Sequence, residues 1–192
     1  MTIGDEVKTA MNNMIKTRVT VQEFLAMPDM EGIVELINGE VVVNTPKFDH
    51  QLASGSIYTF LKGLTSREQV CIAPMSVHLD DENFVQPDVF WVSGAESKCQ
   101  LGDDGYWHGA PDLVVEVLSP STRNQDKRVK FKLYEKQGVR EYWIVEPKES
   151  YLEVWRLEEG RLIPIGVYNL GESFTSPLFA DRKLEITALL QS

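Results

Sequence analysis

The first third of the chain shows an apolar and polar pattern that predicts a helix, a hairpin and a longer helix. A capping box at residues 20–23 precedes apolar positions and predicts a short helix. Two apolar runs, 33–37 and 40–43, flank Asn38-Gly39, which is the strongest short hairpin signal. A threonine-proline pair then opens a predicted helix over 45–64, because apolar residues recur along one face of it.

The middle of the chain is richest in strand signals. Two apolar runs, 70–79 and 84–92, predict strands on either side of the polar turn 80–83. Pro87 inside the second run requires a sheet edge, a bulge or the start of a strand, since proline cannot donate to a ladder. We expect residues 93–110 to form a loop.

Beyond this loop, the pattern changes from strand to helix and back to strand. Residues 112–118 are almost continuously apolar, which is typical of a strand covered on both faces. A helix is predicted over about 124–137, and strands over 141–146, 151–156 and 161–168.

These elements predict one mixed α/β domain with a strand–strand–strand–helix–strand centre. We expect this domain to span residues 19–192 and residues 1–18 to form a loose N-terminal arm. After the last predicted strand, only a turn at 187–190 looks regular.

Composition supports a globular protein without a membrane partner. The chain has 192 residues, of which 43% are hydrophobic and 25% are charged. No run approaches the roughly 18 apolar residues of a membrane span. The N-terminal stretch lacks the apolar core of a secretion signal, so we expect a cytoplasmic location. Two cysteines, Cys71 and Cys99, are too few for a disulfide framework or a four-thiolate zinc site.

Charge excludes a protein that coats DNA through general basicity. The net charge is −10, whereas such proteins bind by neutralising phosphate. Seven of the 19 cationic side chains nevertheless fall between Arg123 and Arg140, and eight acids fall between Val77 and Asp112. An acidic stretch followed by a basic one favours a site that binds metal cations next to a phosphate group. The alternative is an acidic loop followed by a solvated helix face.

Two acids stand in apolar surroundings. Glu116 interrupts the strand at 112–118, and Asp88 precedes another apolar run. A buried carboxylate is costly unless it is paired, hydrogen-bonded or bound to metal. Two neighbouring carboxylates also repel each other, and Mg²⁺ would remove both problems. An ion pair or a capping role is the alternative for each acid alone.

Glu35 and Lys130 are the further candidates. Alternation places Glu35 on the face of Ile33 and Ile37, as a ligand, a supporting base or a plain hairpin charge. Asp126, Lys130 and Tyr134 recur every four residues and share one helix face. Lys130 could orient the attacking water and offset charge in a phosphorane-like transition state. Alternatively, Lys130 forms a surface pair with Asp126.

Together these segments resemble the uncharacterised putative restriction endonuclease family, a bacterial branch of the PD-(D/E)XK nuclease superfamily. The similarity covers about residues 18–185. The segments that carry it are Glu35-Leu-Ile-Asn-Gly39, His50, Gln86-Pro-Asp88, Pro111-Asp-Leu-Val-Val-Glu-Val-Leu-Ser-Pro120, the Asp126/Lys130/Tyr134 helix and Gly138-Val-Arg-Glu-Tyr-Trp-Ile-Val-Glu-Pro147.

The resemblance implies an α/β restriction-endonuclease-like core, a mixed sheet flanked by helices with additional β-hairpins. It implies a Mg²⁺-dependent phosphodiesterase site and a homodimer. Asp88 and Glu116 then take the roles of the two motif acids, and Glu35 that of an additional N-terminal glutamate. The motif lysine is replaced by Leu118, and Lys130 fits a branch that supplies its lysine from the following helix. His50 either assists near the site or has a capping or packing role.

The leading hypothesis is a metal-dependent endonuclease that hydrolyses phosphodiester bonds in DNA. Asp88, Glu116 and Glu35 would bind Mg²⁺, with Mn²⁺ as a substitute, and Lys130 would polarise the water. The substrate phosphates would contact the cationic side chains Arg123, Lys127 and Arg128. The alternative is a nuclease fold kept as a binding or assembly module with little catalysis, and RNA or a branched structure is another possible substrate.

Overall fold

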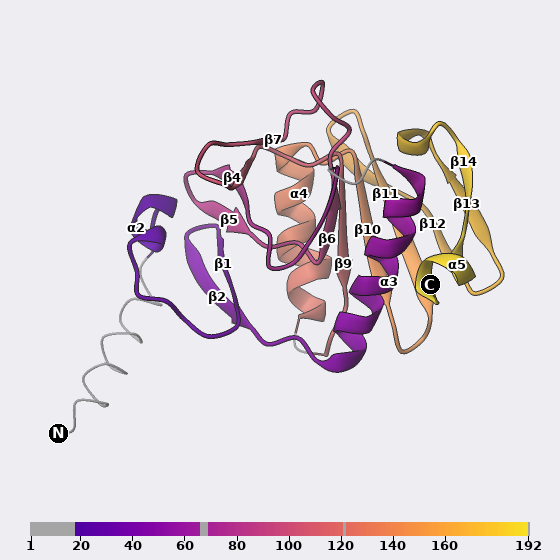
Figure 1. Cartoon of the computed structure of the whole chain (residues 1–192), viewed down its shortest axis with the longest axis horizontal. Coiled ribbons are helices and arrows are strands. Elements are labelled where there is room, and N and C mark those ends of the chain that lie inside the picture. The colour runs from indigo at the N-terminus through magenta and orange to yellow at the C-terminus, as the bar shows by residue number, and fades with distance from the viewer. Residues whose placement is uncertain (1–17, 66–68, 121, 192) are drawn as a thin grey trace.

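The computed structural model describes residues 18–65, 69–120 and 122–191. The predicted N-terminal arm therefore lies outside the described residues, apart from Arg18. Within these ranges the strands form two six-stranded sheets and a separate two-stranded hairpin (Figure 1). No helix among the described residues has both the length and the apolar character needed to span a membrane.

The central sheet carries the strand–helix–strand unit that the sequence predicts. Its strands, in spatial order, are β12 (Arg161–Asn169), β11 (Tyr151–Glu158), β10 (Glu141–Glu146), β9 (Leu113–Val117), β6 (Val89–Trp91) and β3 (Val70–Ile72). The β9 and β10 strands are parallel, and every other neighbouring pair is antiparallel. A parallel pair needs a crossover, and here the helical segment between β9 and β10 provides it.

The second sheet is built around the predicted hairpin. Its order is β2 (Glu40–Asn44), β1 (Ile33–Ile37), β5 (Asn83–Val85), β4 (Val77–Asp80), β8 (Trp107–His108) and β7 (Gln100–Leu101). The short helix α2 (Val21–Leu25) begins at the predicted capping box and packs Val21 and Phe24 against Leu36 and Phe84 of this sheet.

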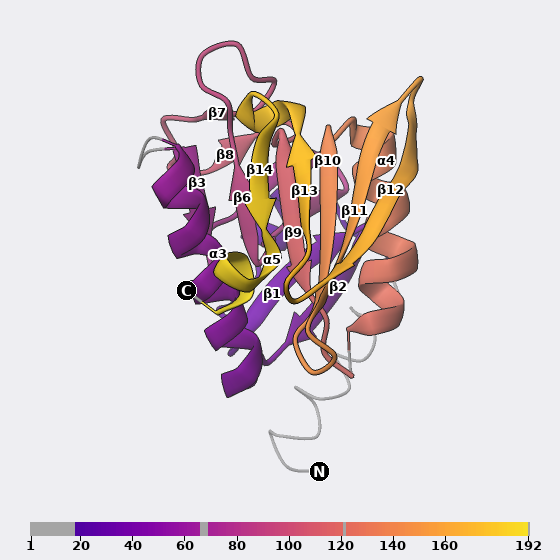
Figure 2. The same ribbon diagram turned by 90° about the vertical axis from the view of Figure 1, so that its right-hand side faces the viewer.

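Helices cover both faces of the central sheet (Figures 1 and 2). One face carries α3 (Phe48–Leu64), α5 (Ile186–Leu190) and the hairpin of β13 (Ser173–Ser176) and β14 (Arg182–Glu185). The other face carries α4 (Phe131–Gln137), which lies between the two sheets in Figure 1. The mixed α/β prediction is confirmed.

Side-chain alternation along β9 decides which way its acid points. All of Leu113–Val117 is buried, as predicted for a strand covered on both faces. Leu113, Val115 and Val117 pack into the core beneath α3, whereas Val114 packs into the core beneath α4. Glu116 alternates with the first set, so it faces α4 and the second sheet.

The two long strands predicted in the middle of the chain are wrong as single elements. The run 70–79 divides into β3 and β4, and the run 84–92 divides into β5 and β6. A proline lies at each division, and proline cannot continue a ladder. Each half pairs in a different sheet, so the chain crosses between the sheets twice.

Other boundaries also differ from the predictions. The second helix begins at Phe48 because Lys47 is still extended, and the predicted loop 93–110 contains β7 and β8. The C-terminal region forms β13, β14, the 3-10 turn η3 (Pro177–Phe179) and α5, where only a final turn was expected. Its strands are short and bury few apolar residues, so they leave a weak pattern.

Candidate active site

The segment between β5 and β6, which crosses from the second sheet to the central sheet, brings Glu35 and Asp88 together. The β5 strand ends at Val85 in the second sheet and β6 begins at Val89 in the central sheet. The backbone amide of Gln86 donates a hydrogen bond of 2.9 Å to Glu35 Oε1, so Glu35 on β1 is held next to this segment. Glu35 is 1% exposed, so it is a buried carboxylate and not a solvent-exposed hairpin charge.

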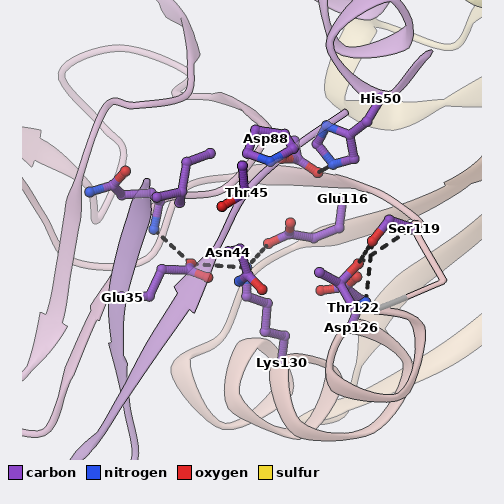
Figure 3. Close-up of a pocket in the computed structure, with 13 residues that line it drawn as sticks. Glu35, Asn44, Thr45, His50, Asp88, Glu116, Ser119, Thr122, Asp126 and Lys130 are labelled. Atoms are coloured by element: carbon purple, nitrogen blue, oxygen red, sulfur yellow. Dashed lines mark hydrogen bonds and ion pairs between the residues drawn. The ribbon is translucent and has the colours of Figure 1, made fainter. Parts of the chain in front are cut away.

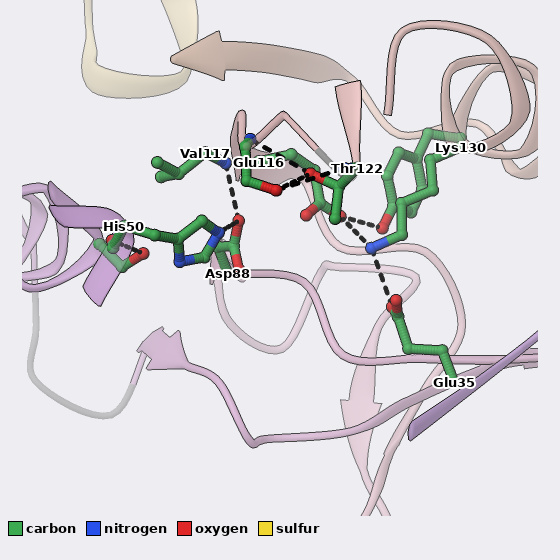
Figure 4. Close-up of polar contacts among 10 residues, drawn as sticks. Glu35, His50, Asp88, Glu116, Val117, Thr122 and Lys130 are labelled. Carbon is green, nitrogen blue, oxygen red and sulfur yellow. Dashed lines mark hydrogen bonds and ion pairs between the residues drawn. The ribbon is translucent and has the colours of Figure 1, made fainter. Parts of the chain in front are cut away.

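Strand register places Asp88 beside Glu116. Val89 pairs with Val115 in the antiparallel β6–β9 ladder, so the next step outward sets Asp88 opposite Glu116. The Val117 amide donates to Asp88 Oδ2 at 2.7 Å, and His50 Nε2 lies 3.1 Å from the same oxygen. His50 comes from α3 on the other face of the sheet, so three elements converge on Asp88 (Figure 4).

Lys130 completes the group from the helical segment between β9 and β10. Its Nζ lies 2.9 Å from Glu35 Oε1 and 3.0 Å from Glu116 Oε1 (Figure 4). The Tyr134 hydroxyl donates to Glu116 Oε1 at 2.7 Å. Leu118 is buried in the core at the position of the motif lysine, so the lysine reaches this site from the helix instead.

The helix that carries Lys130 is π-helical in its first part. Residues Gln125–Lys130 (η2) form a π-helical turn that runs directly into α4, which ends at Gly138 in the left-handed conformation. Single π-turns inside helices are frequent at functional sites. The sequence predicts an ordinary helix here, and the pattern of apolar residues does not distinguish the two.

Asp126 is the site residue that sequence reasoning missed. It is 2% exposed and lines the same pocket as Glu35, Asp88, Glu116 and Lys130 (Figure 3). The alternative of a surface pair between Asp126 and Lys130 is wrong, because both are buried and Lys130 pairs with the two glutamates. The sequence does contain a signal for the burial of Asp126. Asp126 shares a helix face with Lys130 and Tyr134, and a large aromatic residue such as Tyr134 indicates that this face is buried.

Burial dominates the electrostatics of these acids. Desolvation raises the pKa of Glu116 well above its ordinary value, although the charge of Lys130 acts in the opposite direction. Desolvation likewise raises the pKa of Asp126 to about 6, against the influence of Lys130 and a hydrogen bond from Thr122. Neighbouring carboxylates contribute to both shifts, because like charges in one pocket disfavour each other's ionised forms.

The neighbouring carboxylates favour the protonated forms of the two basic groups. Desolvation would lower the pKa of Lys130, but the neighbouring Glu116 and Glu35 outweigh it and raise this pKa well above its ordinary value. Desolvation would also lower the pKa of His50, but its hydrogen bond to Asp88 and the charge of Asp88 raise it overall. A lysine that stays protonated is a source of positive charge rather than a proton acceptor.

The donor set suits a hard divalent cation. Four carboxylates face one lysine in a cavity of about 30 Å³, which has room for roughly two water-sized particles. Mg²⁺ prefers oxygen ligands and needs only one or two carboxylates, because it keeps several waters. Among the described residues, no three acids, histidines or cysteines already stand close enough to enclose an ion. The site fits the open mode of Mg²⁺ binding and not a closed protein cage.

The predicted phosphate contacts lie outside this pocket. Arg123 is ion-paired with Glu146 and Lys127 with Glu153, on strands β10 and β11. Arg128 is exposed, and within the described part of the chain it makes no ion pair. The structure thus brings together the four predicted acid and lysine residues but not the three predicted phosphate contacts.

Comparisons with known proteins agree with this architecture. The crystal structure of a putative nuclease of the DUF820 family from Anabaena variabilis superposes with a TM-score of 0.71. It is 18% identical, and the match covers 90% of this chain and 97% of that one. No curated protein matches this chain. The model of the Uma2 family, described as putative restriction endonuclease, matches residues 21–188. The chain therefore belongs to the Uma2 family of putative restriction endonucleases.

Proposed function

We propose that this protein is a Mg²⁺-dependent endonuclease that hydrolyses phosphodiester bonds in DNA. The observation that carries the proposal is the convergence of Glu35, Asp88, Glu116 and Lys130 in one pocket. They come from two sheets and a helix that are distant in sequence, and nothing in the fold alone requires buried acids to meet there.

Each residue takes a role that its surroundings favour. Asp88 and Glu116 would hold the cation, with Mn²⁺ as a substitute, and Glu35 would support them. When bound, Mg²⁺ activates water and neutralises charge on the phosphate. Lys130, kept protonated by its two glutamates, would orient the attacking water and stabilise the negative charge that develops on phosphorus-bound oxygens.

The remaining proposals concern the substrate and the assembly. Arg128, exposed on η2, would contact the DNA backbone. Arg123 and Lys127 would also contact it after exchanging their glutamate partners for phosphate. We propose a homodimer because a two-fold arrangement presents one site to each strand of a duplex. A reducing cytoplasm would suit Cys71 and Cys99, which are both unpaired.

Cleavage of supercoiled plasmid tests the proposal. The parent protein should nick plasmid DNA with Mg²⁺ or Mn²⁺ and lose this activity in EDTA. Asp88→Ala should be inactive, whereas Asp112→Asn, a buried aspartate at the other end of β9, should cleave like the parent. Equal nicking by the parent and Asp88→Ala would contradict the proposal. Single-stranded RNA and branched DNA, offered in parallel, identify the preferred polynucleotide.

One observation favours a second candidate, a nuclease fold that binds without cutting. The Lys130 amine stands between Glu35 and Glu116, and no set of three ligands is preassembled within the described residues. A binding module of this kind should retain nucleic acid in a mobility-shift assay but show neither cleavage nor a Mg²⁺ site that depends on Glu116.

A further inference from the structure

We propose that Asp126 supplies an additional ligand oxygen, Oδ2, to the divalent cation that Asp88 and Glu116 bind. This inference rests on the proposed function and extends its ligand set to the helix wall of the pocket. Asp126 lies on η2, opposite the strand that carries Glu116, so the cation would be held from both walls (Figure 3).

The first support is an oxygen without a partner. Asp126 Oδ2 is buried and has no hydrogen-bond partner among the described residues. Buried charged groups in proteins are normally paired or coordinate metals. By contrast, Glu35 Oε1, Asp88 Oδ2 and Glu116 Oε1 each accept two contacts from protein nitrogen or hydroxyl groups.

The second support is that the local cation is already engaged. Lys130 is only one turn away from Asp126, yet its amine pairs with Glu35 and Glu116 at 2.9 and 3.0 Å. Asp126 stays within electrostatic reach of Asp88 and Glu116, and the three charges repel one another. A positive ion between the three carboxylates would relieve this repulsion and occupy the free Oδ2.

The third support is position. Asp126 and Thr122 both line the pocket, and a hydrogen-bonding influence from the Thr122 side chain lowers the pKa of Asp126 against the effect of burial. A polar neighbour that favours the ionised form of a carboxylate is typical of the groups that surround metal ligands.

Calorimetric titration of MnCl₂ into the full chain tests the inference without an activity assay. Parent protein, Asp126→Asn, Glu116→Gln and Asp112→Asn are compared after treatment with EDTA and desalting. Asp112→Asn is the matched control, since Asp112 is also buried but is paired with Arg140 at the far end of β9. Thermal unfolding in EDTA establishes that each variant folds, and Asp126→Ser replaces Asp126→Asn if that variant does not.

Asp126→Asn should bind Mn²⁺ at least about tenfold more weakly than the parent, because even outer partners of metal ligands contribute 10- to 100-fold. Glu116→Gln should lose binding, and Asp112→Asn should match the parent. Parent-like affinity in Asp126→Asn, with binding lost in Glu116→Gln, would overturn the role of Asp126 alone. Absence of Mn²⁺ binding by the parent would overturn the proposed function as well.

Discussion

Replacing Lys130 by methionine removes the buried cation while keeping most of the length of the side chain. The amine lies 2.9 Å from one glutamate and 3.0 Å from the other, and all three groups are almost fully buried. With an effective dielectric constant of about 20, each pair contributes an attraction of about 6 kcal/mol. Much of this attraction offsets desolvation, and breaking a buried pair from one side typically costs about 3–5 kcal/mol.

We therefore expect Lys130→Met to lower the free energy of unfolding by about 3–5 kcal/mol at pH 8, measured by urea denaturation in EDTA. Lys127→Met is the matched control on the same helical turn. Its ion pair with Glu153 is partly exposed, and such pairs contribute about 1 kcal/mol or less.

The loss of folding free energy in Lys130→Met should also depend on pH. Without Lys130, Glu116 loses the charge that holds its pKa down, so the folded variant binds a proton more tightly than the unfolded chain does. Stability is then fully present below the ordinary glutamate pKa of 4.5 and declines as the pH rises above it. The difference from the parent should be smaller at pH 5 than at pH 8. A loss under about 1 kcal/mol that is equal at both pH values would refute the buried Lys130 bridge.

Three further predictions concern the chemistry of the pocket. Tyr134→Phe removes the hydroxyl that hydrogen-bonds Glu116. The kcat for plasmid cleavage should fall roughly tenfold with KM unchanged, because the lost hydrogen bond contributes about 1.4 kcal/mol to the position of Glu116. An unchanged kcat would contradict this role. The Mg²⁺ affinity measured by calorimetry should rise between pH 5 and pH 7.5, because Asp126 and Glu116 must release protons to bind the ion. The pKa of Asp126 is about 6, within this range. An affinity independent of pH would count against both residues as ligands. Arg128→Ala should weaken DNA binding and reduce the slope of the logarithm of the binding constant against the logarithm of salt concentration by about one. Arg123→Ala should have less effect because Glu146 already neutralises Arg123. Equal salt slopes for the parent and Arg128→Ala would exclude the phosphate contact.

The sequence was most informative where one local pattern sufficed. The hairpin at Asn38-Gly39, the strand Leu113–Val117 and the strand Glu141–Glu146 are all predicted correctly, because each has a turn signal or a mostly apolar run. Alternation puts Glu35 on the same face as Ile37, and both side chains are buried.

The sequence failed where pairing partners decide the structure. Nothing local in the runs 70–79 and 84–92 reveals that their halves belong to different sheets. That division is nevertheless what carries the chain past Glu35 to Asp88. Long-range pairing, unlike periodicity, cannot be read from neighbouring residues.

The same limit applies to the site. Burial of an acid can be predicted from its apolar neighbours. For Lys130 the helix spacing leaves two alternatives, the acidic site or a surface pair with Asp126, and spacing alone does not decide between them. The structure directs Lys130 to the acidic site, where it pairs with two glutamates on different elements. His50 was ambiguous in the sequence, and only the packing of α3 against the central sheet places it beside Asp88.

The most direct test of the central claim is a crystal of the full chain soaked in MnCl₂ and measured at the manganese absorption edge. We predict one anomalous peak in the pocket, roughly 2.2 Å from carboxylate oxygens of both Asp88 and Glu116, as expected for a hard divalent ion. A pocket without such a peak, while manganese appears elsewhere on the protein, would contradict the claim that these acids assemble to hold a cation.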